Sequence, residues 1–188
     1  APQQAVLWQG DRLEIRGEKG DYLQVYDHRR ERAGFVRNTQ VRVQSLKPEA
    51  APELLSIVRF LKDSPGSESL GIGYATAYLM AVPPEGVNGE VFDALGTMAD
   101  RLARRASAKQ ATKVAADTVA AQLEVAGSYG VEMQSFEREG QMQLCYNGDA
   151  HRRVLALPAT DRQKAQSALA LTRHECVAPT LTPVERFA

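Results

Sequence analysis

Apolar and polar residues alternate in short bursts from Trp8 to Val43. Four bursts can be distinguished: Leu13 and Ile15, Tyr22 to Tyr26, Ala33 to Val36, and Val41 to Val43. Turn-forming or charged segments separate them, above all 17–21 and the charged run Asp27–Arg32. Short alternating segments with such turns between them predict strands of a small, strongly bent antiparallel β-barrel.

Beyond residue 52 the apolar period lengthens from two to between three and four residues, which is typical of helices. We expect helices over 53–62, 67–82, 90–106, from 112 past 123, over 149–157 and over 161–174. Pro48 and Pro52 oppose regular structure between the two patterns. The predicted fold class is therefore α+β: a barrel over 1–47, a linker over 48–52 and an all-α helical domain over 53–188.

One stretch of the helical half is ambiguous. Helical spacing from Val125 to Phe136, with Gly140 as a C-terminal stop, predicts a helix. Alternation within 131–133 and 142–146 would instead form a hairpin. We favour the helix.

The N-terminal segment contains, in order, Gly10-Asp11, Leu13, Ile15, Gly20-Asp21-Tyr22, Val25, Gly34-Phe35-Val36 and Val41. This order resembles a bacterial SH3 domain, and the resemblance covers about a quarter of the 188 residues. The resemblance implies an envelope or extracellular module that binds peptidoglycan or other proteins and is seldom catalytic. The usual first strand of the family is missing before Trp8.

The best predicted interaction surface lies on the barrel, beside the charged run. Aromatic and arginine side chains together make good contact surfaces for proteins and for the sugars or peptides of a cell wall. The candidate ligand-binding residues are Trp8, Tyr22, Tyr26, His28, Arg29 and Phe35. The competing interpretation is that a barrel of this size needs its aromatic residues as core.

Composition excludes several classes of function. Lys+Arg and Asp+Glu balance at 23 each, so no global field recruits nucleic acid or anionic lipid. No apolar stretch reaches the length of a transmembrane helix. No nucleophile-elbow, zinc-protease or dinucleotide motif appears, and Gly71 and Gly73 indicate close helix packing rather than a phosphate loop. We therefore assign no catalytic residue and no cofactor.

The two cysteines, Cys145 and Cys176, are expected to form a disulfide. If the helices on either side of Pro158 form an antiparallel hairpin, both cysteines lie at its open end. A zinc site with His151 and His174 is the alternative, but the spacing does not match a compact structural zinc module, so we predict no metal.

Three features together favour the bacterial periplasm or the cell exterior. They are the SH3-like segment, the cysteine pair, and a start at Ala1-Pro2 without methionine, which is typical of a product of signal-peptide cleavage.

These observations predict a non-catalytic binding or scaffolding protein whose SH3-like module recognises a protein partner or peptidoglycan. One alternative is a cell-wall-targeted enzyme with its site among the helices, which a cleft with two convergent ionisable side chains would favour. Another is an accessory subunit of a larger envelope assembly, because a missing strand leaves a sheet edge to be paired.

Overall fold

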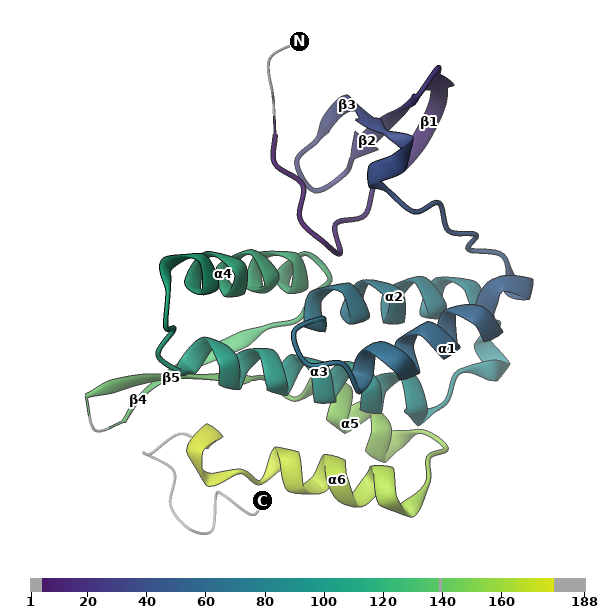
Figure 1. Cartoon of the computed structure of the whole chain (residues 1–188). Coiled ribbons are helices and arrows are strands. Elements are labelled where there is room, and N and C mark those ends of the chain that lie inside the picture. Colours follow the sequence, from purple (N-terminus) through teal and green to yellow (C-terminus); the bar gives the residue numbers. More distant parts are fainter. Residues whose placement is uncertain (1–4, 139, 178–188) are drawn as a thin grey trace.

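The computed structural model describes residues 5–138 and 140–177 (Figure 1). This part of the chain is α+β, with six α-helices, a three-stranded sheet and a two-stranded sheet, both antiparallel. The three-stranded sheet sits above the helices in Figure 1, and the second sheet lies among them. The predicted fold class is confirmed at this level.

The N-terminal sheet is a meander of β1 (Glu14–Lys19), β2 (Tyr22–Asp27) and β3 (Arg32–Arg37). One face buries Leu23, Val25 and Val36, with Leu13 and Val41 packed against them. That cluster is separate from the main core of the helices.

The described part of this sheet does not close into a barrel. The fourth expected strand, 41–43, lies in irregular chain after the 3₁₀ turn Asn38–Gln40, and Val43 is 67% exposed. Because no strand pairs with this segment, β1 and β3 form the two outer edges of the sheet.

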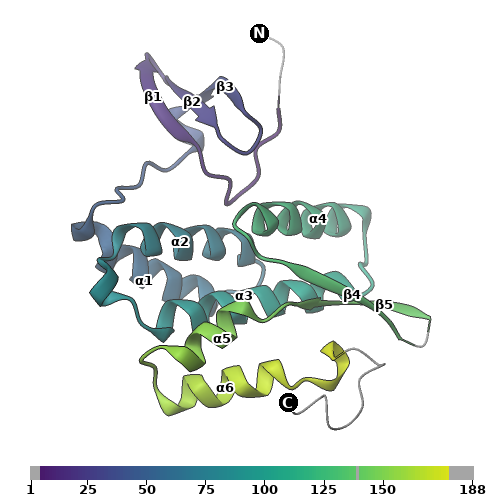
Figure 2. The same ribbon diagram turned by 180° about the vertical axis from the view of Figure 1, so that it is seen from behind.

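The helices are α1 (Ala51–Lys62), α2 (Glu68–Ala81), α3 (Gly89–Ser107), α4 (Lys113–Ser128), α5 (Asp149–Ala156) and α6 (Asp161–Leu171). The long helix α3 lies at the centre of the group, with α1 and α2 on one side and α5 and α6 on another (Figures 1 and 2). Its Val91, Met98 and Leu102 are completely buried. The six expected helices are present, with ends shifted by a few residues.

The linker expected at 48–52 is largely helical. Pro48–Ala50 form a 3₁₀ turn, and α1 starts directly afterwards with Pro52 in its first turn. A proline there costs nothing, because the first N–H groups of a helix have no intrahelical acceptor. The irregular connection between sheet and helices is 41–47.

The preference for a helix through Phe136 was wrong, and the hairpin alternative is what forms. Strands β4 (Met133–Arg138) and β5 (Gln141–Tyr146) pair in antiparallel register, so the second half of the chain is not all-α. Gly130, at φ +80°, ends α4 before this hairpin, a left-handed conformation that glycine adopts without strain. The Ser107 hydroxyl of α3 bonds both backbone groups of Leu144, which ties β5 to the core.

Close packing explains the two glycines of α2, as expected. A Cβ on Gly71 would overlap the sulfur of Met98 and lie 3.2 Å from Leu61 Cβ. A Cβ on Gly73 would lie 3.2 Å from the carbonyl oxygen of Gly10. Neither position allows a larger residue without displacing a neighbour.

The expected disulfide between Cys145 and Cys176 is confirmed, with the two Cα atoms 5.6 Å apart. It joins β5 to the 3₁₀ turn His174–Cys176 that follows α6. None of the described helices has the length and apolar character needed to cross a membrane.

Candidate functional site

Three of the predicted aromatic residues share one face of the N-terminal sheet. Gln24 pairs with Phe35, so Tyr22, Tyr26 and Phe35 all point away from the face that buries Leu23. Phe35 is 60% exposed and Tyr22 41% exposed. The core therefore occupies the other face and leaves the rings of Tyr22 and Phe35 exposed, while Tyr26 is half-buried.

Two arginines complete this surface. The guanidinium carbon of Arg16 lies 3.9 Å from the centroid of the Tyr26 ring, within range of a cation–π interaction. The Nε of Arg37 donates to the Tyr22 hydroxyl at 3.2 Å. We call the surface formed by Arg16, Tyr22, Tyr26, Phe35 and Arg37 the aromatic face.

His28 borders the aromatic face, with its ring centroid 4.8 Å from that of Tyr26. Its Nε2 lies 2.6 Å from the Glu14 carboxylate, which also accepts from Arg16. Hydrogen bonds from Arg16 and then His28 lower the pKa of Glu14. The only carboxylate among these residues is thus neutralised locally, so the aromatic face keeps a positive character through Arg37.

The other two predicted residues lie elsewhere. Arg29 turns toward the helices, where it donates to the Glu124 carboxylate of α4 at 2.6 Å and to the Glu124 carbonyl at 3.3 Å. Trp8 is 41% exposed and belongs to a turn closed by a hydrogen bond from Asp11 N to its carbonyl, ahead of β1. Four of the six predicted residues therefore come together, and two belong to the junction between sheet and helices.

The turn around Gly10 makes the closest contacts of that junction. Ser69 Oγ donates to the Gln9 carbonyl at 3.1 Å, and Tyr129 Oη donates to the Gly10 carbonyl at 2.5 Å. Burial raises the pKa of Tyr129, which keeps its phenol protonated as a donor. Gly10 has φ +99°, and a Cβ there would lie 2.8 Å from the Ser69 carbonyl oxygen.

Charged residues from the run 27–32 reinforce the junction. Arg30 bonds Asp27 at 2.6 Å and Asp11 at 3.3 Å, and both carboxylates are nearly buried. Burial by itself would raise the pKa of Asp27, but hydrogen bonds from Arg30 and Arg29 outweigh it and the pKa is lowered. Within the run expected to flank a ligand, Arg29 and Arg30 therefore reach Glu124 of α4 and tie the sheet to the helices.

Replacing Tyr129 with phenylalanine is expected to cost about 1 kcal/mol of stability, because the half-buried Gly10 carbonyl loses its donor. Hydrogen exchange at β2 and urea unfolding measure the effect. Tyr22→Phe is the control, since its hydroxyl bonds only an exposed arginine. Equal changes in both variants would contradict the structural role of this junction.

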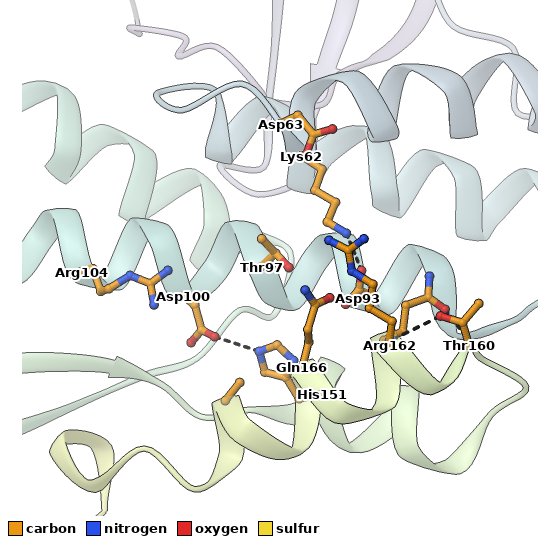
Figure 3. Close-up of a pocket in the computed structure, with 12 residues that line it drawn as sticks. Lys62, Asp63, Asp93, Thr97, Asp100, Arg104, His151, Thr160, Arg162 and Gln166 are labelled. Carbon is orange, nitrogen blue, oxygen red and sulfur yellow. Dashed lines mark hydrogen bonds and ion pairs between the residues drawn. The ribbon is translucent and has the colours of Figure 1, made fainter.

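A second candidate site is a cleft between α3 and α6, with a volume of about 560 Å³ (Figure 3). The buried side chains of Asp93, Asp100 and His151 contribute to its lining. His151 Nε2 lies 2.9 Å from Asp100 Oδ2, and Nδ1 lies 3.2 Å from Ser167 Oγ. The residues come from α3, α5 and α6, and their spacing in the sequence gave no signal of this arrangement.

The hydrogen-bonded series of Ser167, His151 and Asp100 has a structural role and does not supply a nucleophile. Ser167 is completely buried, whereas a nucleophile must reach its substrate. The second oxygen of Asp100 accepts from Arg173 at 2.5 Å. The imidazole fits against α3 because Gly96 has no side chain, and a Cβ there would lie 2.6 Å from His151 Cε1.

The enzyme alternative requires convergent ionisable groups, and the cleft has them. Each buried carboxylate, however, already has a cationic partner: Asp93 pairs with Lys62 at 2.5 Å, and Asp100 with Arg173. Both carboxylates are therefore already engaged in ion pairs within the protein. Across 5–138 and 140–177, no cluster of three or more His, Cys, Asp or Glu side chains is placed to hold a metal.

Comparisons with protein-family models, with curated proteins and with solved structures found no match for this chain.

Proposed function

We propose that this protein is a non-catalytic binding or scaffolding protein of the bacterial envelope, and that its N-terminal SH3-like sheet recognises a protein partner or peptidoglycan through the aromatic face. The observation that carries the proposal is the exposure of Phe35 and Tyr22 on the side of the sheet opposite its core. Exposed aromatic rings flanked by arginines are enriched where proteins bind partners.

Contacts among the side chains of the aromatic face support a binding role. Arg16 is held over Tyr26 and by Glu14, and Arg37 is held by Tyr22. Side chains fixed before binding lose less conformational entropy when a partner arrives. The disulfide is compatible with an oxidising compartment, where peptidoglycan and envelope proteins are found.

The sheet edges favour a second candidate function, that of an accessory subunit in a larger envelope assembly. Strands β1 and β3 each leave one edge without a partner strand in the described part of the chain. An extended segment from another protein would pair there through its backbone. Crosslinks from β1 or β3 edge positions, and none from the aromatic face, would favour this candidate.

Mutation of the aromatic face tests the main proposal. Replacing Phe35 with alanine is expected to weaken retention on purified peptidoglycan or on the envelope partner by roughly tenfold, with a similar loss for Tyr22→Ala. Both residues are exposed, so the fold should survive. Pull-down with each immobilised material is the measurement.

Phe60→Ala is the matched control, because Phe60 on α1 is 72% exposed and lies outside the sheet. Unchanged retention of Phe35→Ala on both materials, or an equal loss for Phe60→Ala, would contradict the proposal.

A further inference from the structure

The cleft between α3 and α6 has the size of a small-molecule site, and most of the residues that line it are polar or charged. Its volume of about 560 Å³ lies within the usual range of ligand pockets. Ala170 is the one apolar residue among the twelve that line it. An apolar ligand would leave these polar groups without hydrogen bonds, so the cleft suits a polar ligand.

The charges of the cleft are unevenly compensated. The buried Asp93 and Asp100 pair with Lys62 and Arg173. Arg104 and Arg162 also line the cleft, yet neither makes an ion pair with any described residue. The cationic groups still open to a ligand are therefore guanidinium groups, which prefer carboxylate or phosphate partners.

A further acid in the lining narrows the choice of ligand. Lys62 and Arg173 already compensate the charges of Asp93 and Asp100, so these two aspartates leave no net charge to attract or repel a ligand. Asp63, also in the lining and without an ion pair in the described chain, offers an acceptor to a ligand ammonium group. The expected ligand therefore carries both a carboxylate and an ammonium group.

The length of the cleft indicates a ligand of several residues. Asp93 and Arg104 lie eleven positions apart on α3, about 16 Å along the helix axis. Figure 3 shows Arg104 at one end of this row and Arg162 reaching in from α6 toward the other. An extended peptide of about four or five residues spans such a distance.

We infer that this cleft is a binding site for a short zwitterionic peptide, whose carboxylate is held by Arg104 at one end of the cleft. Rigid helices supply the walls, and the network of His151, Asp100 and Arg173 fixes the floor before the ligand arrives. The inference does not depend on the function proposed for the aromatic face.

Tetra-alanine with free termini is the probe, titrated into the full-length ¹⁵N-labelled protein. We expect saturable chemical-shift changes at cleft amides such as Thr97, Gln163 and Gln166. Tetra-alanine amide, which lacks the carboxylate, should bind at least tenfold more weakly, as should the free peptide to the double variant Arg104→Gln/Arg162→Gln.

The control is Lys109→Gln/Lys164→Gln, which removes the same charge from outside the cleft lining. It should bind tetra-alanine as the unmodified protein does. No saturable shifts at cleft amides, equal binding of acid and amide, or equal effects of the two double variants would overturn the inference. Amide spectra of each variant report whether its fold is intact.

Discussion

Replacing Glu68 with alanine is expected to lower the free energy of unfolding by about 3 kcal/mol, because it leaves the partly buried Arg101 and Arg105 without their counter-ion. Glu68 is completely buried at the start of α2. Its carboxylate accepts from Arg101 Nε at 2.5 Å, from Arg105, and from the backbone N–H of Gly66 at 3.0 Å. Both arginines belong to α3, so this carboxylate fastens two core helices together.

The same site predicts how stability depends on pH. Burial by itself would raise the pKa of Glu68, but hydrogen bonds from Gly66 and Arg101 and the charge of Arg105 outweigh it, and the pKa is lowered. A lowered folded-state pKa gives stability that is present above the unfolded-state value, about 4.3 for glutamate, and is lost as pH falls through the folded-state pKa.

Urea unfolding between neutral pH and pH 3 measures both effects. Glu68→Gln should be less stable than the unmodified protein at neutral pH, and its free energy of unfolding should decrease less as the pH is lowered. Glu53→Gln, on the exposed side of α1, should show the same decrease as the unmodified protein. A decrease in the free energy of unfolding of less than about 1 kcal/mol for Glu68→Ala would contradict this role. So would an unchanged dependence of that free energy on acid pH in Glu68→Gln.

Removing the disulfide should cause the second large decrease in the free energy of unfolding. Cys145 and Cys176 are 31 positions apart, and opening a loop of that length costs about 3 to 4 kcal/mol on a chain-entropy estimate. Helix α6 should loosen most, since Ser167 is its one buried residue and polar contacts supply much of its attachment. Unfolding of Cys145→Ser/Cys176→Ser, with hydrogen exchange at α6, tests this.

Intact mass provides the direct control for the bond itself. Protein from its native cells should gain two hydrogens on reduction. Two free thiols in that protein would contradict the oxidising compartment proposed for it. A double variant as stable as the unmodified chain would contradict the structural role of the disulfide.

The sequence predicted the helices well because their apolar positions repeat locally. Leu54, Val58 and Leu61 of α1 follow one another at helical spacing, and all three are buried. The same rule failed between Met133 and Phe136, where two apolar residues three positions apart fit a helix equally well. The left-handed Gly130 and the pairing of β4 with β5 decide that stretch, and sheet pairing is not visible in a local window.

The candidate sites were predictable to different degrees. The residue types indicated an aromatic surface, but only the pairing of Gln24 with Phe35 shows which rings leave the core. Arg29 was assigned to that surface because it is close in sequence, whereas its partner Glu124 is 95 positions away. The cleft could not be predicted for the same reason. Asp100 and His151 are 51 positions apart and come together only because α5 packs on α3.

The central claim is that the aromatic face contacts an envelope partner, and photo-crosslinking in intact cells tests it most directly. A photoreactive phenylalanine analogue at position 35 should give covalent adducts with an envelope protein or with peptidoglycan. The same analogue at position 60, which is also exposed but lies on α1, should give none. No adduct from position 35, or equal adducts from both positions, would contradict the claim.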